Sequence, residues 1–100
     1  MDRSRVVTLI ALSYTQNSIG EQEPVEVKRN VFGNISSISA SEFFDAGRAG
    51  LNAEYRVTMF AYDYEGESIV EIDGTRYGVY RTYLGKNETL ELYLEQKTGV

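Results

Sequence analysis

The dipeptide Asp73-Gly74 constrains the fold of this chain more than any other short stretch. It separates two runs rich in β-branched and aromatic residues, 68–72 and 75–84. Asp-Gly readily adopts the two positive φ angles of a tight two-residue turn, whose twist matches that of the flanking strands. The sequence therefore predicts an antiparallel hairpin of two strands at these positions.

Hydropathy patterning predicts two further strands on either side of this hairpin. Residues 54–62 alternate with a period of two, as a half-buried strand does. Residues 89–97 follow a second turn at 85–87, and there leucines alternate with glutamates and a tyrosine. We therefore expect one face of that strand to enter the core and the other to be largely wet.

The first part of the chain predicts two more strands joined by a long polar connection. Residues 5–14 have a continuous apolar middle, which indicates burial on both faces. Residues 15–24 hold a glycine and the only proline among polar and acidic residues, so we expect an exposed, mobile connection. In the strand 25–38 the alternation resumes out of phase near Phe32, which, with Gly33 nearby, predicts a bulge or a bend.

Residues 37–51 are the only stretch that predicts a helix. Ser39 is a favourable N-cap, and Glu42 follows three residues later, as in a capping box. Gly47 and Gly50 offer two places at which the helix can end, because glycine adopts the left-handed conformation without strain. The helix is therefore expected to be short.

Such a short helix needs support from the rest of the fold. A helix of about two to three turns is unstable alone in water. We therefore expect Phe43 or Phe44 to pack against the β-structure formed by the flanking strands.

These elements together predict a mainly β fold. We expect a small six-stranded antiparallel β-barrel or sandwich with one short helical insert between strands 2 and 3. The 100 residues form one domain, residues 1–100, with a single core. With 42% hydrophobic and 25% charged residues, the chain has the composition of a globular protein.

The residue types present restrict the possible chemistry and location. The chain has no cysteine and no histidine, so thiolate chemistry, the commonest metal ligand and the commonest general base are missing. We expect no catalytic residues, no metal and no cofactor. The first residues lack the apolar core of a secretory signal and no apolar run is long, so we expect a soluble protein made in a cytosol, without a membrane partner.

Clustered carboxylates leave two chemical alternatives. Asp63, Glu65 and Glu67 around Gly66 could bind a hard cation, but their spacing does not match an EF-hand loop, and we interpret them as a solvated turn. A pair of carboxylates could also hydrolyse a glycoside. The candidates, on different elements, are Asp45, Glu54, Asp63 and Glu71. Nothing in the sequence places any two of them at the separation that this reaction needs, so we do not expect an enzyme.

Nucleic-acid binding is a further alternative. Tyr77, Tyr80 and Tyr83 interleave with Arg76 and Arg81, a mixture that could stack on bases. In a regular strand Tyr77 and Tyr83 share one face with Arg81, and we predict that they pack in the core or in an interface. The net charge of −5 also opposes nonspecific binding to a phosphate backbone.

The chain resembles the head-tail joining proteins of tailed phages and prophages, also called head-closure or stopper proteins. The resemblance rests on Ser-x-Ser-Glu-Phe-Phe-x-Ala-Gly at 39–47, on Tyr-Arg-Val at 55–57, and on Ile-Val-Glu-Ile-Asp-Gly-Thr-Arg-Tyr-Gly-Val-Tyr-Arg-Thr-Tyr at 69–83. It covers nearly the whole chain. The Glu-Phe-Phe segment and the Asp-Gly hairpin with its following tyrosines are its most specific parts.

The resemblance implies a six-stranded barrel with a helical insert, which forms a ring beneath the portal and its adaptor protein after DNA packaging. Such a ring retains the genome and docks the tail through a tail-joining protein. DNA would pass through it or be blocked by it without specific binding. The protein would be a structural component of the virion, present in the host cytoplasm before assembly.

By position in that family, the insert faces the channel or a neighbouring subunit. The candidate residues here are Glu42, Phe43, Phe44, Asp45 and Arg48. The alternative is a helix that simply covers an open barrel end. Other functions also remain open: a tail-completion ring protein, or a small β-barrel binding module or enzyme unrelated to phages.

Overall fold

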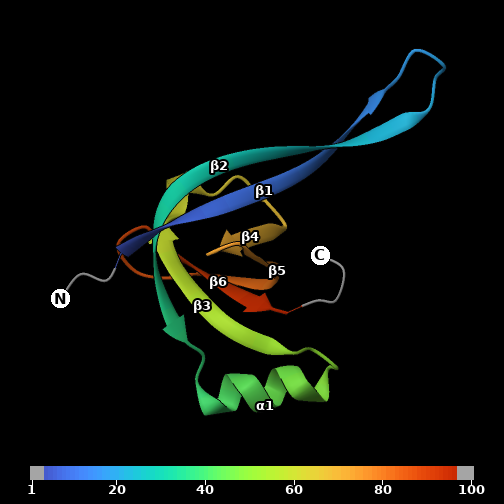
Figure 1. Ribbon diagram of the computed structural model, residues 1–100. Coiled ribbons are helices and arrows are strands. Elements are labelled where there is room, and N and C mark those ends of the chain that lie inside the picture. Colours follow the sequence, from blue (N-terminus) through green and yellow to red (C-terminus); the bar gives the residue numbers. More distant parts are fainter. Residues whose placement is uncertain (1–3, 97–100) are drawn as a thin grey trace.

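The computed structural model describes residues 4–96. Its six strands form one closed antiparallel barrel in the order β1-β2-β3-β6-β5-β4 (Figure 1). The elements are β1 (Ser4–Gln16), β2 (Gln22–Ser37), α1 (Ala40–Arg48), β3 (Ala53–Phe60), a 3-10 turn η1 (Ala61–Asp63), β4 (Ile69–Ile72), β5 (Thr75–Leu84) and β6 (Thr89–Glu95). The predicted mainly β fold, with a helical insert between the second and third strands, is confirmed, and it is a barrel.

The Asp-Gly hairpin has the predicted turn. Asp73 and Gly74 have φ angles of 51° and 82°, and Ile72 pairs with Thr75 on either side of them. This is the left-handed geometry that a tight two-residue turn requires. The turn between β5 and β6 also uses left-handed residues, with φ angles of 58° at Asn87 and 60° at Glu88.

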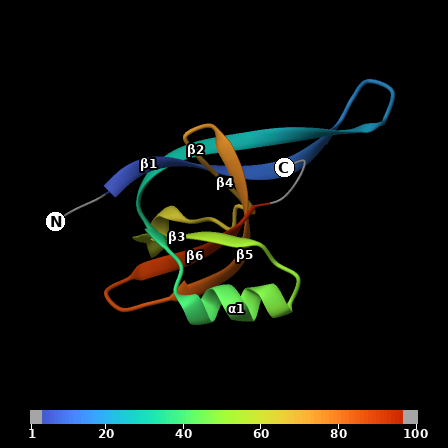
Figure 2. The same ribbon diagram turned by 60° about the horizontal axis from the view of Figure 1, so that its bottom comes forward.

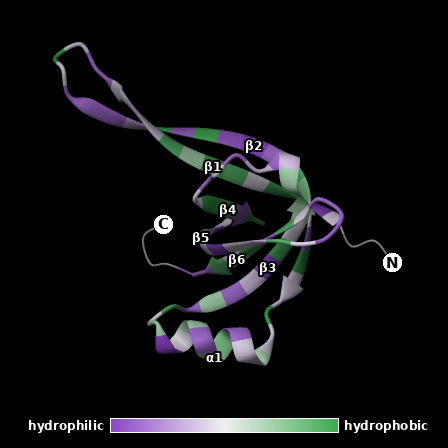
Figure 3. Cartoon of the chain, turned by 180° about the vertical axis from the view of Figure 1, so that it is seen from behind, coloured by the Kyte–Doolittle hydropathy of each residue, from purple (hydrophilic) through white to green (hydrophobic). Residues whose placement is uncertain are grey.

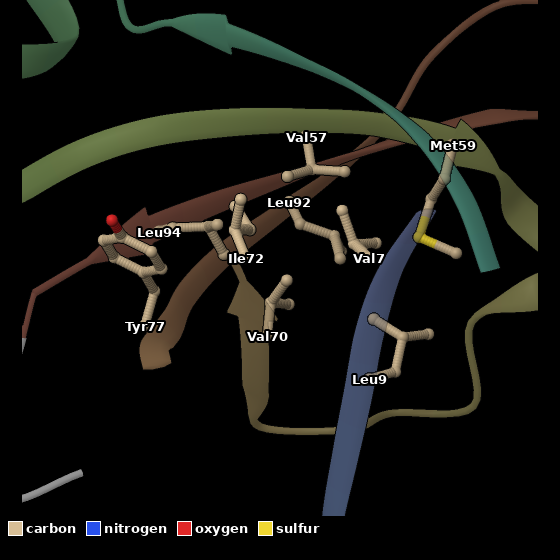
Figure 4. Packing of buried hydrophobic residues seen from close by; sticks show 9 residues of the cluster. All are labelled: Val7, Leu9, Val57, Met59, Val70, Ile72, Tyr77, Leu92 and Leu94. Atoms are coloured by element: carbon tan, nitrogen blue, oxygen red, sulfur yellow. The ribbon is translucent and has the colours of Figure 1, made fainter. Parts of the chain in front are cut away.

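The barrel interior is a single apolar cluster drawn from five of the six strands (Figure 4). Its buried members are Val7, Leu9, Val57, Met59, Val70, Ile72, Tyr77, Leu92 and Leu94. Tyr77 also packs edge-on against Tyr55, with ring centroids 5.5 Å apart. Burial of these side chains is the main source of stability for a domain of this size.

Burial on both faces of β1, expected along its apolar middle, holds for part of the strand. The neighbouring residues Leu9 and Ile10 are both fully buried. Val6 and Leu12, which alternate onto the same face as Ile10, are exposed, so burial on both faces is limited to the middle of the strand.

The expectation that the second face of β6 is wet is wrong at its C-terminal end. Tyr93 and Glu95 are both buried, although they alternate with the core leucines. The cover over Tyr93 comes from β5: the Arg81 guanidinium lies 4.0 Å from the Tyr93 ring centroid. Lys97, the last residue of the predicted strand, lies outside the described residues.

The connection predicted at 15–24 is instead the outer half of a long β-hairpin. β1 continues to Gln16 and β2 begins at Gln22, and the two strands stay paired throughout. Figures 1 and 2 show this ribbon extending well beyond the barrel. We call residues 11–27 the arm. Residues 15–24 show no alternation because both faces of the ribbon meet solvent there, so the period-two signal of a half-buried strand is missing.

The turn at the end of the arm is held by one side chain. Asn17 Oδ1 accepts hydrogen bonds from the backbone N–H groups of Ile19 and Glu21, at 3.0 and 2.9 Å. The Asn17 N–H also donates to the Glu21 carbonyl at 2.8 Å. Pro24 is tolerated because β2 has a second neighbour, β3, only from Gly33 onwards, which makes the arm an edge.

The prediction of a bulge or a bend near Gly33 is half right. The pairing of β2 with β1 and with β3 shows no register shift, so there is no bulge in the described part of β2. β2 does bend along its length (Figure 1). Gly33 pairs with both Arg5 of β1 and Met59 of β3, where β2 passes from one neighbour to the other. A Cβ atom at Gly33 would lie 2.7 Å from Val57 Cγ1, so only glycine permits this approach.

The register shift in β5 overturns the predicted arrangement of its tyrosines. The pairing of β5 with β6 shifts between Val79 and Arg81. Tyr77 therefore enters the core, whereas Tyr83 is 55% exposed, so the two do not share a face. Alternation along a strand predicts faces only where the ladder is regular.

Candidate interaction site on the helical insert

The candidate residues lie on α1, which runs along the side of the barrel away from the β1-β2 ribbon (Figures 1 and 2). The helix begins as predicted. Ser39 has an extended backbone, and its side chain accepts a hydrogen bond from the Glu42 N–H at 3.2 Å. This satisfies one of the backbone donors that a helix start leaves without a partner.

The helix ends at the second of the two predicted glycines. Gly50 has a φ of 80°, and the Leu51 N–H donates to the Ala46 carbonyl at 2.9 Å. The Gly50 N–H donates to the Gly47 carbonyl at 3.0 Å. These two bonds form a Schellman motif, which ends the helix sharply.

The Glu42 side chain does not complete a capping box, and it reaches across to β5 instead. One carboxylate oxygen accepts a hydrogen bond from the Tyr80 hydroxyl at 2.8 Å. The other oxygen is bound by the Arg81 guanidinium. Glu42 therefore fixes the helix to the barrel through a charged group that is only 16% exposed.

The pKa of the Glu42 carboxyl is lowered. Partial burial alone would raise the pKa, but the hydrogen bonds from Tyr80 and Arg81, with the charge of Arg81, outweigh it. Burial raises the pKa of the Tyr80 hydroxyl, and its hydrogen bond to Glu42 raises that pKa further. The pair thus holds a charged carboxylate and a neutral phenol at neutral pH.

A register shift in β5 allows Tyr80 and Arg81 to contact the same residue, Glu42. In a regular strand two consecutive side chains point to opposite faces. The register shift between Val79 and Arg81 removes that restriction, so both residues reach Glu42. Arg81 is held in place by the Tyr93 ring beneath it. A bulge that redirects a side chain in this way is common near functional positions.

Phe43 and Phe44 do not hold the helix, contrary to the expectation. They are 50% and 62% exposed, and their rings form an edge-to-face pair with centroids 5.8 Å apart. The residue that packs inward is Ala46, which is 4% exposed. Glu42 and Ala46 are four residues apart and lie on one face of the helix, which leaves the two phenylalanines on other faces.

The remaining two candidate residues form an exposed pair. Arg48 Nη1 and Asp45 Oδ1 are 3.2 Å apart, and both side chains are mostly exposed. Such surface pairs contribute little to stability. Between α1 and β5 lies an open groove of about 560 Å³ lined by Glu42, Asp45, Ala46, Ala49, Leu51, Tyr80 and Arg81.

The acidic turn that was considered as a cation site instead contacts the guanidinium of Arg29. Arg29 Nε and Nη2 donate to Glu67 at 2.8 and 2.5 Å, and Arg29 also pairs with Glu65 at 3.1 Å. Glu67 is buried, and the Glu65 N–H donates to its second oxygen at 2.8 Å. Among the described residues there is no group of acidic side chains arranged to hold a metal ion. The network ties the acidic turn to Arg29 of β2.

The insert is therefore suited to contact another macromolecule. Two adjacent aromatic rings are at least half exposed. They lie near an exposed charge pair, on a helix that Glu42 and Ala46 hold against the barrel. Rigid aromatic side chains of this kind dominate the energetics of protein interfaces. Within residues 4–96, no helix is both long and apolar enough to cross a membrane.

Sequence reasoning missed a second exposed apolar surface, on the arm. Leu12, Tyr14, Ile19, Val25 and Val27 are all at least 39% exposed. The β-branched residues at 25 and 27 and the Asn17-x-x-Gly20 spacing were the available signals for a hairpin. They were masked by the glutamates and the proline around them.

Comparison of the chain with protein-family models, with curated proteins and with solved structures found no match.

Proposed function

We propose that this protein is a structural, non-enzymatic component of the head-tail connector of a tailed phage. In this proposal it forms a ring that closes the head, retains packaged DNA and docks the tail. Its partners are the portal and adaptor proteins, a tail-joining protein and further copies of itself, and its place is the virion. The resemblance of residues 39–47 and 69–83 to head-closure proteins supports this assignment.

The observation that carries the proposal is the outward pair Phe43 and Phe44 on a fixed helix. Exposing two aromatic rings is costly for a protein that works alone, and contiguous exposed apolar surface usually marks an interaction site. The Glu42 contacts with β5 hold the helix without help from these rings. The two rings therefore stay available for a neighbouring subunit or for the channel.

The charge of the chain is compatible with this role. With a net charge of −5, the protein gains little from a phosphate backbone, so DNA can slide past it without being held. An exposed carboxylate on the insert, Asp45, is paired with Arg48, which leaves that pair with no net charge.

The test is to ask whether the chain is part of a virion. Particles are induced from the strain that carries the gene, purified on a gradient and analysed by mass spectrometry, beside a deletion strain. We expect the protein in wild-type particles, and empty heads with free tails in the deletion strain. A plasmid copy should restore filled, tailed particles. Absence of the protein from purified particles, or a normal titre without the gene, would contradict the proposal.

A further inference from the structure

A third apolar feature lies far from the insert, at the end of the barrel opposite the arm. It is a surface pocket of about 290 Å³ lined by Ala61, Tyr62, Leu84, Gly85 and Glu88. Tyr62 and Leu84 are 72% and 65% exposed. In Figures 1 and 2 the turn between β5 and β6, which forms part of the lining, lies on the N-terminal side, whereas the arm extends in the other direction.

The turn at the tip of the arm carries an exposed hydrophobic side chain. Ile19 is 75% exposed, more than any other large hydrophobic residue in the described chain. In Figure 3 the loop at the end of the arm is mostly hydrophilic, with a hydrophobic segment at its tip. The Asn17 hydrogen bonds hold the backbone of this turn, so presenting Ile19 costs little further ordering on binding.

We propose that the arm of one copy inserts Ile19 into the pocket beside Tyr62 of the next copy. The two surfaces differ and lie at opposite ends of the molecule. A contact between unlike surfaces repeats head to tail, and it closes into a ring when the rotation allows. This inference rests on the proposed ring assembly and names the contact that would build it.

Charge favours this arrangement over pairing of two arms. The arm contains Glu21, Glu23 and Glu26 and no lysine or arginine, so two arms side by side would bring like charges together. The pocket has Glu88 on its lining, but Lys86 is exposed in the same turn. With one lysine and one glutamate, this turn has no net charge to oppose the acidic arm.

The arm is also fixed to the barrel at its base. Glu26 binds the Arg76 guanidinium of β5 through both carboxylate oxygens, at 2.5 and 2.8 Å. Arg76 also lies 3.4 Å from Glu71 of β4. The arm is thus tied to the barrel wall, and its tip is carried on a stiff ribbon rather than on a loose loop.

Disulfide trapping tests the contact directly, because the chain has no cysteine of its own. A tagged Ile19→Cys variant is mixed with an untagged Leu84→Cys variant and oxidised. Both positions are exposed, so neither substitution should affect folding, and circular dichroism checks this. We expect the mixed dimer to exceed its random share, because the two thiols approach within disulfide distance only in the proposed contact.

The matched control replaces Leu84→Cys with Phe44→Cys, which is similarly exposed but lies on the insert. We expect only the random share of mixed dimer with this partner. The double variant Ile19→Cys/Leu84→Cys should in addition give a ladder of higher multimers. Equal trapping with both partners, or a product dominated by Ile19→Cys homodimers, would overturn the inference.

This experiment uses purified protein, so its result is separate from the test of function. Trapping at Leu84 with no protein in virions would leave the contact standing and remove the phage assignment. Protein in virions without specific trapping would keep the assignment and remove this contact.

Discussion

The Tyr80 hydroxyl donates a hydrogen bond to the Glu42 carboxylate across 2.8 Å, from the middle of β5 to the first turn of α1. Together with Arg81, which binds the other carboxylate oxygen, it is the polar attachment of the insert to the barrel. The helix is therefore held by its glutamate and by Ala46, and its phenylalanines are left outside.

The first prediction concerns this attachment. The substitution Glu42→Gln keeps the shape of the side chain but removes the charge that Arg81 binds. We expect the free energy of unfolding to fall by about 1–2 kcal/mol, as for loss of a charged hydrogen bond in a partly buried site. Urea denaturation measures this, with Asp45→Asn as the control, since that exposed pair should contribute little. Equal effects of the two substitutions would mean that Glu42 does not anchor the helix.

The pH dependence of the same variant follows from the lowered pKa of Glu42. A carboxyl whose pKa is lower in the folded than in the unfolded state stabilises the fold at pH values above its ordinary pKa. That contribution is lost as the pH falls from the ordinary value of 4.5 through the lowered one. The stability difference between wild type and Glu42→Gln should therefore be full at pH 7 and shrink below about pH 4.5. A difference that grows on acidification would contradict the assignment of the carboxylate as the stabilising form.

A second prediction compares two glycines. Gly33→Ala places a methyl group 2.7 Å from Val57 Cγ1, inside the core, and should destabilise the protein by about 1–3 kcal/mol. Gly47→Ala places the same group where no heavy atom lies within 4 Å, within α1. Alanine is a better helix former, so this variant should gain about 0.5–1 kcal/mol. Thermal or urea unfolding of both variants checks the opposite signs, and similar losses in both would show that the bend at Gly33 is not tightly packed.

A third prediction separates folding from function in the insert. The double variant Phe43→Ser/Phe44→Ser should unfold within about 1 kcal/mol of wild type, since exposed residues contribute little. Phage assembled with it should contain fewer DNA-filled heads, and shortening residues 40–52 to a glycine-containing turn should have the same effect. The measurements are the melting transition and the fraction of filled heads by electron microscopy. Filled, infectious particles with a normal melt would show that the insert does not contribute to closure.

A fourth prediction concerns the free protein. We expect a monomer, or an oligomer that forms weakly and with rising concentration, because contacts as small as one arm tip in one pocket fall at the low end of specific interfaces. Size exclusion with light scattering measures the mass across a range of concentrations. A stable ring at micromolar concentration without any partner would argue against assembly templated by the portal complex.

A fifth prediction is that duplex DNA binds negligibly near physiological salt. The chain carries a net charge of −5, and Arg29, Arg76 and Arg81 are engaged with glutamates. They are therefore not free to follow a phosphate backbone. A fluorescence anisotropy titration checks this. Micromolar affinity would restore β5, with its tyrosines and arginines, as a nucleic-acid surface.

Features set by local chemistry could be predicted from the sequence. The turn at Asp73-Gly74, the bounds of β5 and the Ser39 cap each depend on residues close together in the chain, and all three are confirmed. The six antiparallel strands also follow from the spacing of strands and turns, which left a barrel and a sandwich both open; the structure shows the closed barrel. In these places local propensity and global fold agree.

Features set by distant partners could not be predicted. The Glu42 side chain binds Tyr80, 38 residues away, instead of completing a capping box. The side chain of Tyr80 is directed by a register shift in β5 that no local sequence pattern predicts. That contact decides which face of α1 is inward, and so it decides the exposure of Phe43 and Phe44. The outer part of the arm, residues 15–24, was not predicted as a hairpin, because a ribbon with both faces exposed to solvent lacks alternation.

The strand edges of the arm affect whether the protein aggregates. Closing the barrel removes free strand edges there, but residues 11–16 of β1 and 22–32 of β2 pair on one side only. Such edges are templates for stacking into aggregates. Pro24 has no N–H to extend the ladder, and each stacked copy would add its own Glu21 and Glu23 beside those of the last. The same residues that hid the arm in the sequence thus keep its backbone from recruiting further strands, while its tip stays open to a partner.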